Sequence, residues 1–307
     1  MMAGAEVTVL DGGMGRELQR IGAPFRQPEW SALALIEAPE RVAEVHDSFA
    51  CAGANVLTTN SYALVPFHLG PALFDEAGAT LANRAGAVAR GVADRRGTKV
   101  AGSLPPTLGS YQPDAFDPIA GRAILGVLIA GLKPHVDVWL AETLSLLDEA
   151  QLVAELLAGD TRPLWLSFTL KDQLESGSQA VLRSGESVAA AAGLAQSSGA
   201  AALLFNCSYP EVMEAAIREA AAALGESGIA LGVYANGFGP PPKDYSANAA
   251  VRDIRTDLGP SQYLTWARRW VAAGATLVGG CCGIGPDHIA ALAQDFQHTA
   301  IASRAEA

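Results

Sequence analysis

The segment ATLVGGCCGIGPDHIAALAQDF, residues 275–296, contains the unit from which the fold is predicted. It begins with a short run of apolar residues at 275–282, which is typical of a strand buried on both faces. A second stretch at 285–296 follows a glycine-rich turn and spaces its apolar residues as a helix does. The segment therefore predicts one strand followed by one helix.

The same strand-then-helix unit recurs along the whole chain. The predicted strands lie at 7–13, 55–61, 99–104, 136–143, 163–170, 201–207, 229–236 and 275–282. The predicted helices lie at 39–53, 75–94, 118–132, 146–159, 186–199, 210–225, 260–274 and 285–296, of which 118–132 has the weakest pattern. Eight such units favour a closed (β/α)8 TIM barrel over an open sheet. We expect a single domain over residues 1–307, with its core at about 7–296.

Composition and charge exclude several classes of protein. Half of the 307 residues are hydrophobic and 17% are charged, which supplies enough apolar material for a large core. The formal net charge of −11 and the absence of a basic run argue against a nucleic-acid partner. No apolar run is long enough to span a membrane, and the first residues do not resemble a signal peptide. We therefore expect a cytoplasmic protein, and its oligomeric state stays open.

Polar residues follow the predicted strands at their carboxyl ends, where barrel enzymes carry their chemistry. These residues are Asp11, Thr58, Thr59, Asn60, Ser103, Glu142, Thr143, Ser167, Asn206, Cys207, Asn236, Cys281 and Cys282. Because the strand ends meet at one mouth of a barrel, we expect these side chains to lie close together.

Three of the four cysteines fall at this mouth. Cys207 ends the sixth predicted strand, and the adjacent pair Cys281 and Cys282 ends the eighth, so that three thiolates can converge on one Zn²⁺ and leave a fourth position open. Adjacent residues of a strand point to opposite faces, so both thiols can bind one ion only where the strand breaks into a loop. Inert buried thiols and a redox pair remain as alternatives. Cys51, within a predicted helix, is expected to pack in the core.

The histidines offer no further ligand by position. His46, His68, His135, His288 and His298 all lie outside the predicted strand ends. We therefore expect each of them at the surface or at a helix cap.

Four segments together resemble one known family. They are DGGMGRELQR (11–20), HDSFACAGANVLTTNSY (46–62), FNCSYPEVM (205–213) and VGGCCGIGPDHI (278–289). They are similar to the homocysteine S-methyltransferase family, and the likeness extends over nearly the whole chain. The resemblance implies a (β/α)8 barrel in which Cys207, Cys281 and Cys282 hold a zinc ion. It also implies that Asp11 and Glu142 hold the amino group of homocysteine, although either carboxylate could instead cap a loop.

The resemblance predicts an enzyme that moves a methyl group from an onium donor to the thiol of homocysteine, giving methionine. The chain leaves no room for the extra domains of the folate- and cobalamin-dependent members, which points to S-methylmethionine or S-adenosylmethionine as the donor. A metal that binds a thiol removes its proton and so supplies the nucleophile. Three alternatives stay open: a betaine-type donor, another thiol or selenol as the acceptor, and a non-catalytic zinc- or thiol-binding barrel.

The other residues at the mouth have less defined roles. Thr59, Asn60, Ser103, Asn206 and Asn236 are predicted to contact substrate, and the two asparagines could equally form turns. The loop at 102–114 is expected to overlie the mouth. Three aromatic residues, Trp30, Tyr62 and Tyr111, could line a site for a cationic methyl group or could simply pack.

Overall fold

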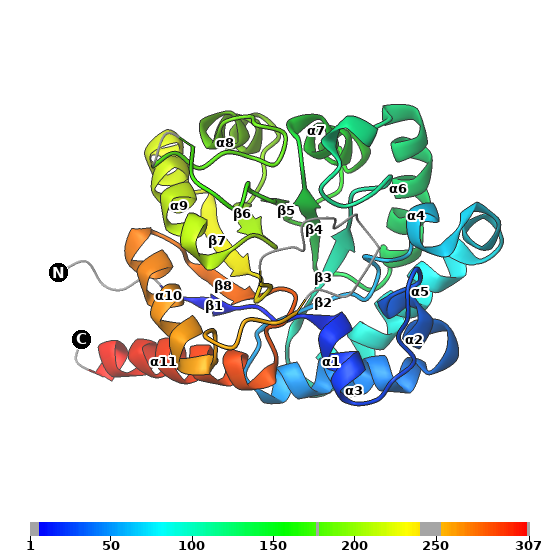
Figure 1. Ribbon diagram of the computed structural model, residues 1–307, viewed down its shortest axis with the longest axis horizontal. Coiled ribbons are helices and arrows are strands. Elements are labelled where there is room, and N and C mark those ends of the chain that lie inside the picture. Colours follow the sequence, from blue (N-terminus) through cyan, green and yellow to red (C-terminus); the bar gives the residue numbers. More distant parts are fainter. Residues whose placement is uncertain (1–5, 176–177, 240–252, 306–307) are drawn as a thin grey trace.

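The computed structural model describes residues 6–175, 178–239 and 253–305. Figure 1 shows the strands at the centre of the molecule and the helices around them. The described residues form a (β/α)8 barrel, as the alternation of strand-like and helix-like segments predicts.

All eight predicted strands are present and parallel. They are β1 (Thr8–Val9), β2 (Val56–Thr58), β3 (Lys99–Leu104), β4 (Val138–Leu144), β5 (Leu164–Phe168), β6 (Ala202–Asn206), β7 (Ala230–Ala235) and β8 (Leu277–Gly280). From β2 to β8 each strand pairs with the next one in sequence, and β1 pairs with β8. A parallel bridge between Leu10 and Val56 joins β1 to β2 and closes the ring.

The eight crossover helices also lie where the sequence predicts them. They are α3 (Pro39–Cys51), α5 (Pro71–Arg96), α6 (Pro118–Leu132), α7 (Leu147–Leu156), α8 (Val188–Ser197), α9 (Pro210–Leu224), α10 (Pro260–Ala273) and α11 (Pro286–Ala305). The weakly patterned α6 is confirmed, and its start is fixed by the Asp117 side chain, which accepts hydrogen bonds from the amides of Ile119 and Ala120.

Short helices that were not predicted lie in the segments that follow the first three strands. They are α1 (Met14–Arg20), α2 (Ser31–Glu37), α4 (Pro66–Leu69) and the 3₁₀ turn η1 (Pro113–Ala115). Segments that follow a strand of a barrel begin at its mouth, so these insertions enlarge the wall of the mouth.

Two apolar clusters hold the barrel together. The larger one lies between the strands and the helices, and the smaller one includes Leu10, Val56, Leu140, Leu204 and Leu277. Side chains alternate across each strand, so Leu140 and the residue two positions later, Glu142, face the same side. The apolar side chains inside the barrel are therefore followed, at the strand ends, by a layer of polar side chains on the same side.

In the described part of the chain, no helix combines the length and the apolar character needed to cross a bilayer.

Candidate functional site

A cavity of about 230 Å³ lies at the carboxyl ends of the strands. Its lining combines the three thiols predicted at the mouth, the two predicted carboxylates and a group of aromatic side chains. The predicted thiols and carboxylates therefore lie together in one cavity.

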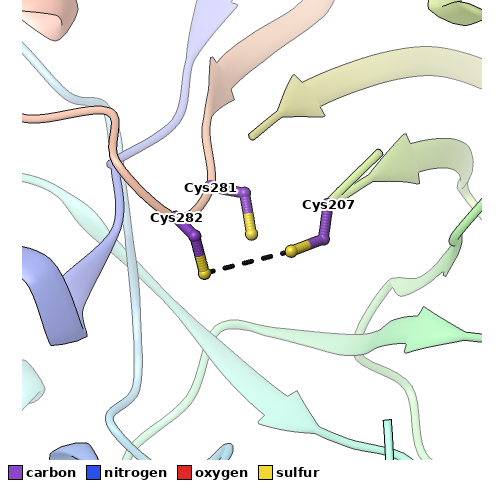
Figure 2. A group of neighbouring side chains, drawn as sticks. All are labelled: Cys207, Cys281 and Cys282. Carbon is purple, nitrogen blue, oxygen red and sulfur yellow. Dashed lines mark hydrogen bonds between the residues drawn. The ribbon is translucent and has the colours of Figure 1, made fainter. Parts of the chain in front are cut away.

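The sulfur atoms of Cys207, Cys281 and Cys282 lie within 4.8 Å of one another. Figure 2 shows them pointing toward a common centre, with Cys207 supplied by the end of β6 and the pair by the end of β8. The sulfurs of Cys207 and Cys282 are 4.0 Å apart, about twice the length of a disulfide bond, and all three thiols are free. The cluster could hold a metal ion.

The local backbone explains how adjacent cysteines can share one centre. Strand β8 ends at Gly280, and the Ile284 amide donates to the Cys281 carbonyl oxygen at 3.0 Å, so the pair opens a tight turn. Cys207 comes directly after β6 and has a φ of 51°, a left-handed conformation that takes the chain out of the strand. The predicted break of the eighth strand at this pair is confirmed.

The three thiols differ in the direction of their pKa shifts. Hydrogen-bonding contacts with the thiols of Cys281 and Cys282 hold the pKa of Cys207 well below its usual range, and the pKa of each of these two thiols is raised. Tyr111 also donates from its hydroxyl to the Cys207 sulfur at 2.9 Å. Burial raises the pKa of Tyr111 well above its usual value, so this hydroxyl keeps its proton and acts as a donor.

Asp11 lies in the cavity wall just after β1. Its carboxylate accepts hydrogen bonds from the Thr58 amide at 2.7 Å and from the Thr58 hydroxyl at 2.9 Å. Burial raises the pKa of Asp11 to about 7, and the two hydrogen bonds from Thr58 only partly oppose this shift.

Glu142 occupies the end of β4 and is also buried in the wall. Its carboxylate accepts hydrogen bonds from the Ser103 hydroxyl and, at 3.3 Å, from the Tyr234 hydroxyl. Burial raises its pKa to about 7 as well. Both carboxyls line the same cavity and have raised pKa values, and a positively charged ligand beside them would favour their charged forms.

The other predicted contact residues divide into two groups. Thr59 and Asn60 line the cavity, although Asn60 already donates to the Ser31 carbonyl oxygen at 3.0 Å. Ser103, Asn206 and Asn236 lie outside the lining. The Ser103 hydroxyl orients Glu142, the Asn206 amide oxygen accepts from the Thr143 amide at 3.0 Å, and the Asn236 amide oxygen accepts from the Phe238 amide at 3.1 Å.

Aromatic side chains form part of the wall of the cavity. All three predicted candidates, Trp30, Tyr62 and Tyr111, belong to the lining. Phe25 and Phe67 line it too, and neither was among the residues that the sequence singled out. Phe25 and Trp30 pack edge to face with their ring centroids 5.7 Å apart.

Some expectations for single residues are wrong. Cys51 is exposed at the end of α3 and does not pack in the core. His46 and His68 are buried, although surface or cap positions were expected. His68 lines the cavity, and its Nδ1 lies 3.2 Å from the Pro28 carbonyl oxygen. Burial lowers the pKa of His68 to about 4, so the ring is neutral at physiological pH.

The chain is similar to known proteins along nearly its whole length. The family model described as homocysteine S-methyltransferase matches residues 8–296. The homocysteine S-methyltransferase of Escherichia coli (strain K12) is 32% identical over 310 residues, which cover 94% of each chain. The selenocysteine methyltransferase of Astragalus bisulcatus is 27% identical and covers 92% of this chain and 90% of its own.

The fold is also similar to that of a solved structure of a homocysteine methyltransferase. The metallated form of the homocysteine methyltransferase MmuM from Escherichia coli superposes with a TM-score of 0.77 at 28% identity, covering 94% of this chain and 96% of that one. These matches favour an enzyme over the non-catalytic thiol-binding barrel that the sequence left open. The chain belongs to the homocysteine S-methyltransferase family.

Proposed function

We propose that this enzyme transfers a methyl group from a sulfonium donor, S-methylmethionine or S-adenosylmethionine, to the thiol of homocysteine, with a zinc ion held by Cys207, Cys281 and Cys282. The observation that carries the proposal is the placement of the three free thiols and the two buried carboxylates in one cavity. Homocysteine carries a thiol and an ammonium group, which these two sets of side chains would bind.

The sulfur positions fit zinc. With Zn–S bonds of about 2.3 Å and tetrahedral angles, ligand sulfurs lie roughly 3.8 Å apart. The 4.0 Å between the sulfurs of Cys207 and Cys282, and the 4.8 Å limit for the group, need only small side-chain adjustments to reach this spacing. Three thiolates leave one tetrahedral position for the sulfur of the substrate. When bound, zinc supplies the substrate thiol in its deprotonated, nucleophilic form.

Asp11 and Glu142 would hold the ammonium group of homocysteine by charge-assisted hydrogen bonds. In the free cavity, burial raises the pKa of each carboxyl to about 7, and an ammonium between them would favour the ionised forms. The hydroxyls of Ser103 and Tyr234 each donate one hydrogen bond to the Glu142 carboxylate and so fix its position. The substrate is thereby held at both ends, by its amino group and by its sulfur.

The aromatic wall suits the donor. Trp30, Tyr62 and Tyr111 present rings to the cavity, and a positively charged methyl donor gains roughly 0.5 to 2 kcal/mol from each ring that it faces. A sulfonium leaves as a neutral thioether, so the displacement needs no strong general acid. Among the described residues that line the cavity, His68 is the one histidine, and its neutral ring is consistent with this chemistry.

A donor panel tests the proposal. The purified enzyme is incubated with homocysteine and, separately, S-methylmethionine, S-adenosylmethionine or betaine, and methionine formation is followed. We expect methionine with at least one sulfonium donor and much slower turnover with betaine. Faster turnover with betaine would replace the sulfonium assignment with the betaine-type alternative. Because one relative is named as a selenocysteine methyltransferase, a parallel series with selenocysteine as the acceptor tests the selenol alternative.

A further inference from the structure

Tyr111 contacts the thiol cluster from a segment that is distant in sequence. It lies between β3 and α6, and its hydroxyl is 2.9 Å from the Cys207 sulfur and 3.5 Å from the Cys207 carbonyl oxygen. The sulfur is the nearer acceptor, so the hydroxyl donates chiefly to a predicted metal ligand.

Both residues of this hydrogen bond have left-handed backbones. The φ of Tyr111 is 63° and that of Cys207 is 51°, in a region that residues with a Cβ rarely adopt. Such conformations persist only where surrounding contacts stabilise them, and they are concentrated at functional sites. The geometry that brings the hydroxyl to the sulfur is therefore maintained against a local energetic cost.

Neighbouring contacts hold Tyr111 in place on two sides. The Arg183 guanidinium lies 5.0 Å from the centroid of the Tyr111 ring, and Arg183 pairs with Asp172 at 3.2 Å. On the other side, the hydroxyls of Ser110 and Tyr62 lie 2.6 Å apart. The phenol is thus fixed by a cation at its ring and by a hydrogen bond at the preceding residue.

We propose that Tyr111 is a positioning residue of the thiol cluster, which aims the Cys207 sulfur at the metal and reduces the electron density that this sulfur donates. A hydrogen bond from an outer group to a ligand fixes its orientation and changes its strength as a donor. The inference rests on the proposed function, because it takes Cys207 to be a metal ligand.

Cobalt(II) is the probe, because thiolate ligands give it a charge-transfer absorption band whose energy depends on the electron density of the sulfur. The Tyr111→Phe variant keeps the ring and removes the hydroxyl. We expect its band to move to longer wavelength than in the parent enzyme, because a sulfur that has lost a hydrogen bond gives up an electron more easily. We also expect zinc affinity, measured against a competing chelator, to fall by about tenfold, because the lost orientation of the Cys207 sulfur outweighs its stronger donation.

The matched control is Tyr62→Phe, which removes a hydroxyl that supports the same loop through Ser110. Because this variant keeps the Tyr111 hydroxyl, its cobalt band should move much less than the band of Tyr111→Phe. An equal shift in both variants would assign the effect to displacement of the loop and overturn the inference. Arg183→Gln gives a second measurement that keeps the hydroxyl, and it should shift the band in the same direction by a smaller amount.

The outcomes separate the two proposals. If the parent enzyme shows a thiolate-to-cobalt band and Tyr111→Phe shows the same band and the same zinc affinity, the role of Tyr111 is refuted while the metal site stands. If the parent enzyme gives no such band, the metal site itself is refuted, and the role of Tyr111 is refuted with it.

Discussion

Gly13 lies directly against the carbonyl group of Cys281. A Cβ atom at Gly13 would be 2.6 Å from the Cys281 carbonyl oxygen and 3.1 Å from the Cys282 Cα. The segment after the first strand and the turn that carries the adjacent thiols therefore pack backbone to backbone. The glycines of DGGMG allow this contact.

The Gly13→Ala variant should consequently disturb the thiol pair. The added methyl group has no room, so the turn must shift, at a cost of about 1 to 3 kcal/mol in the free energy of unfolding. We expect zinc affinity to fall by about tenfold or more. Gly126→Ala is the control, because a Cβ at this exposed position of α6 meets nothing within 4 Å. Equal metal affinity in both variants would contradict the argument.

Substitution of each thiol tests the ligand set. The parent enzyme should bind about one zinc ion per chain, and Cys207→Ala, Cys281→Ala and Cys282→Ala should each lose most of it. Elemental analysis after dialysis against a weak chelator is the measurement, and Cys51→Ala, at an exposed position, is the control. A variant at the cluster that retained full occupancy would remove its cysteine from the ligand set. Because the barrel core does not depend on the cluster, far-UV circular dichroism should change little on zinc removal.

Glu142→Gln separates substrate recognition from metal binding. Glutamine keeps the shape and removes the charge, so zinc content should stay unchanged while homocysteine binds about 10- to 150-fold more weakly. The measurement is kcat/KM for homocysteine and for 4-mercaptobutyrate, which lacks the amino group, in both enzymes. The parent should prefer homocysteine, and the variant should lose most of this preference. Unchanged discrimination in the variant would exclude Glu142 as the ammonium receptor.

The same variant should stabilise the ligand-free protein at alkaline pH. Burial raises the pKa of Glu142 from 4.5 to about 7 in the folded state, so the folded protein binds more protons than the unfolded chain between these values. The stability associated with this carboxyl is present below pH 4.5 and is lost as the pH rises through about 7. Glutamine does not ionise, so the gain should reach roughly 1 to 3 kcal/mol at pH 8 and be small at pH 5. Denaturant unfolding at both pH values checks this, and an equal gain at both would point to packing instead.

His46 should produce the opposite dependence on pH. Its ring is fully buried in α3, and neither of its nitrogens has a hydrogen-bond partner among the described residues. Burial lowers its pKa from 6.5 to about 4, so the stability associated with the neutral ring is present above pH 6.5 and is lost as the pH falls toward 4. His46→Leu should reduce the loss of stability between pH 7 and pH 5, which denaturant unfolding would measure. A variant with the parent's full pH dependence would refute this explanation.

The sequence predicts the barrel well, because alternating periodicities are local properties of the chain. Strand β3, from Lys99 to Leu104, matches its prediction at both ends. The sequence predicts the burial of single side chains in α3 less well. His46 and Cys51 are five residues apart, which at 100° per residue places them about 140° apart around the helix. One face of α3 is buried and comprises Val42, Val45, His46 and Phe49, whereas Cys51 lies outside it. Helical spacing alone could therefore have predicted that His46 is buried and Cys51 exposed.

Other features of the site depend on tertiary contacts and could not be predicted. Asn206 ends β6 and Asn236 directly follows β7, but their side-chain amide oxygens accept hydrogen bonds from the backbone amides of Thr143 and Phe238. The approach of Tyr111 to Cys207 depends on a loop of irregular backbone, for which hydrophobic periodicity gives no signal.

The closure of the barrel at Asp11 has a consequence for how ligand binding can be observed. Only two residues of β1 are in strand conformation, and the Asp11 carboxylate adds two hydrogen bonds to Thr58 across the junction between the first and second strands. A ligand that binds the Asp11 carboxylate from inside the cavity would also change the hydrogen bonds that this carboxylate accepts from Thr58. The rate of hydrogen exchange at the Thr58 amide should therefore change when a ligand occupies the cavity. This change can be measured without an added label.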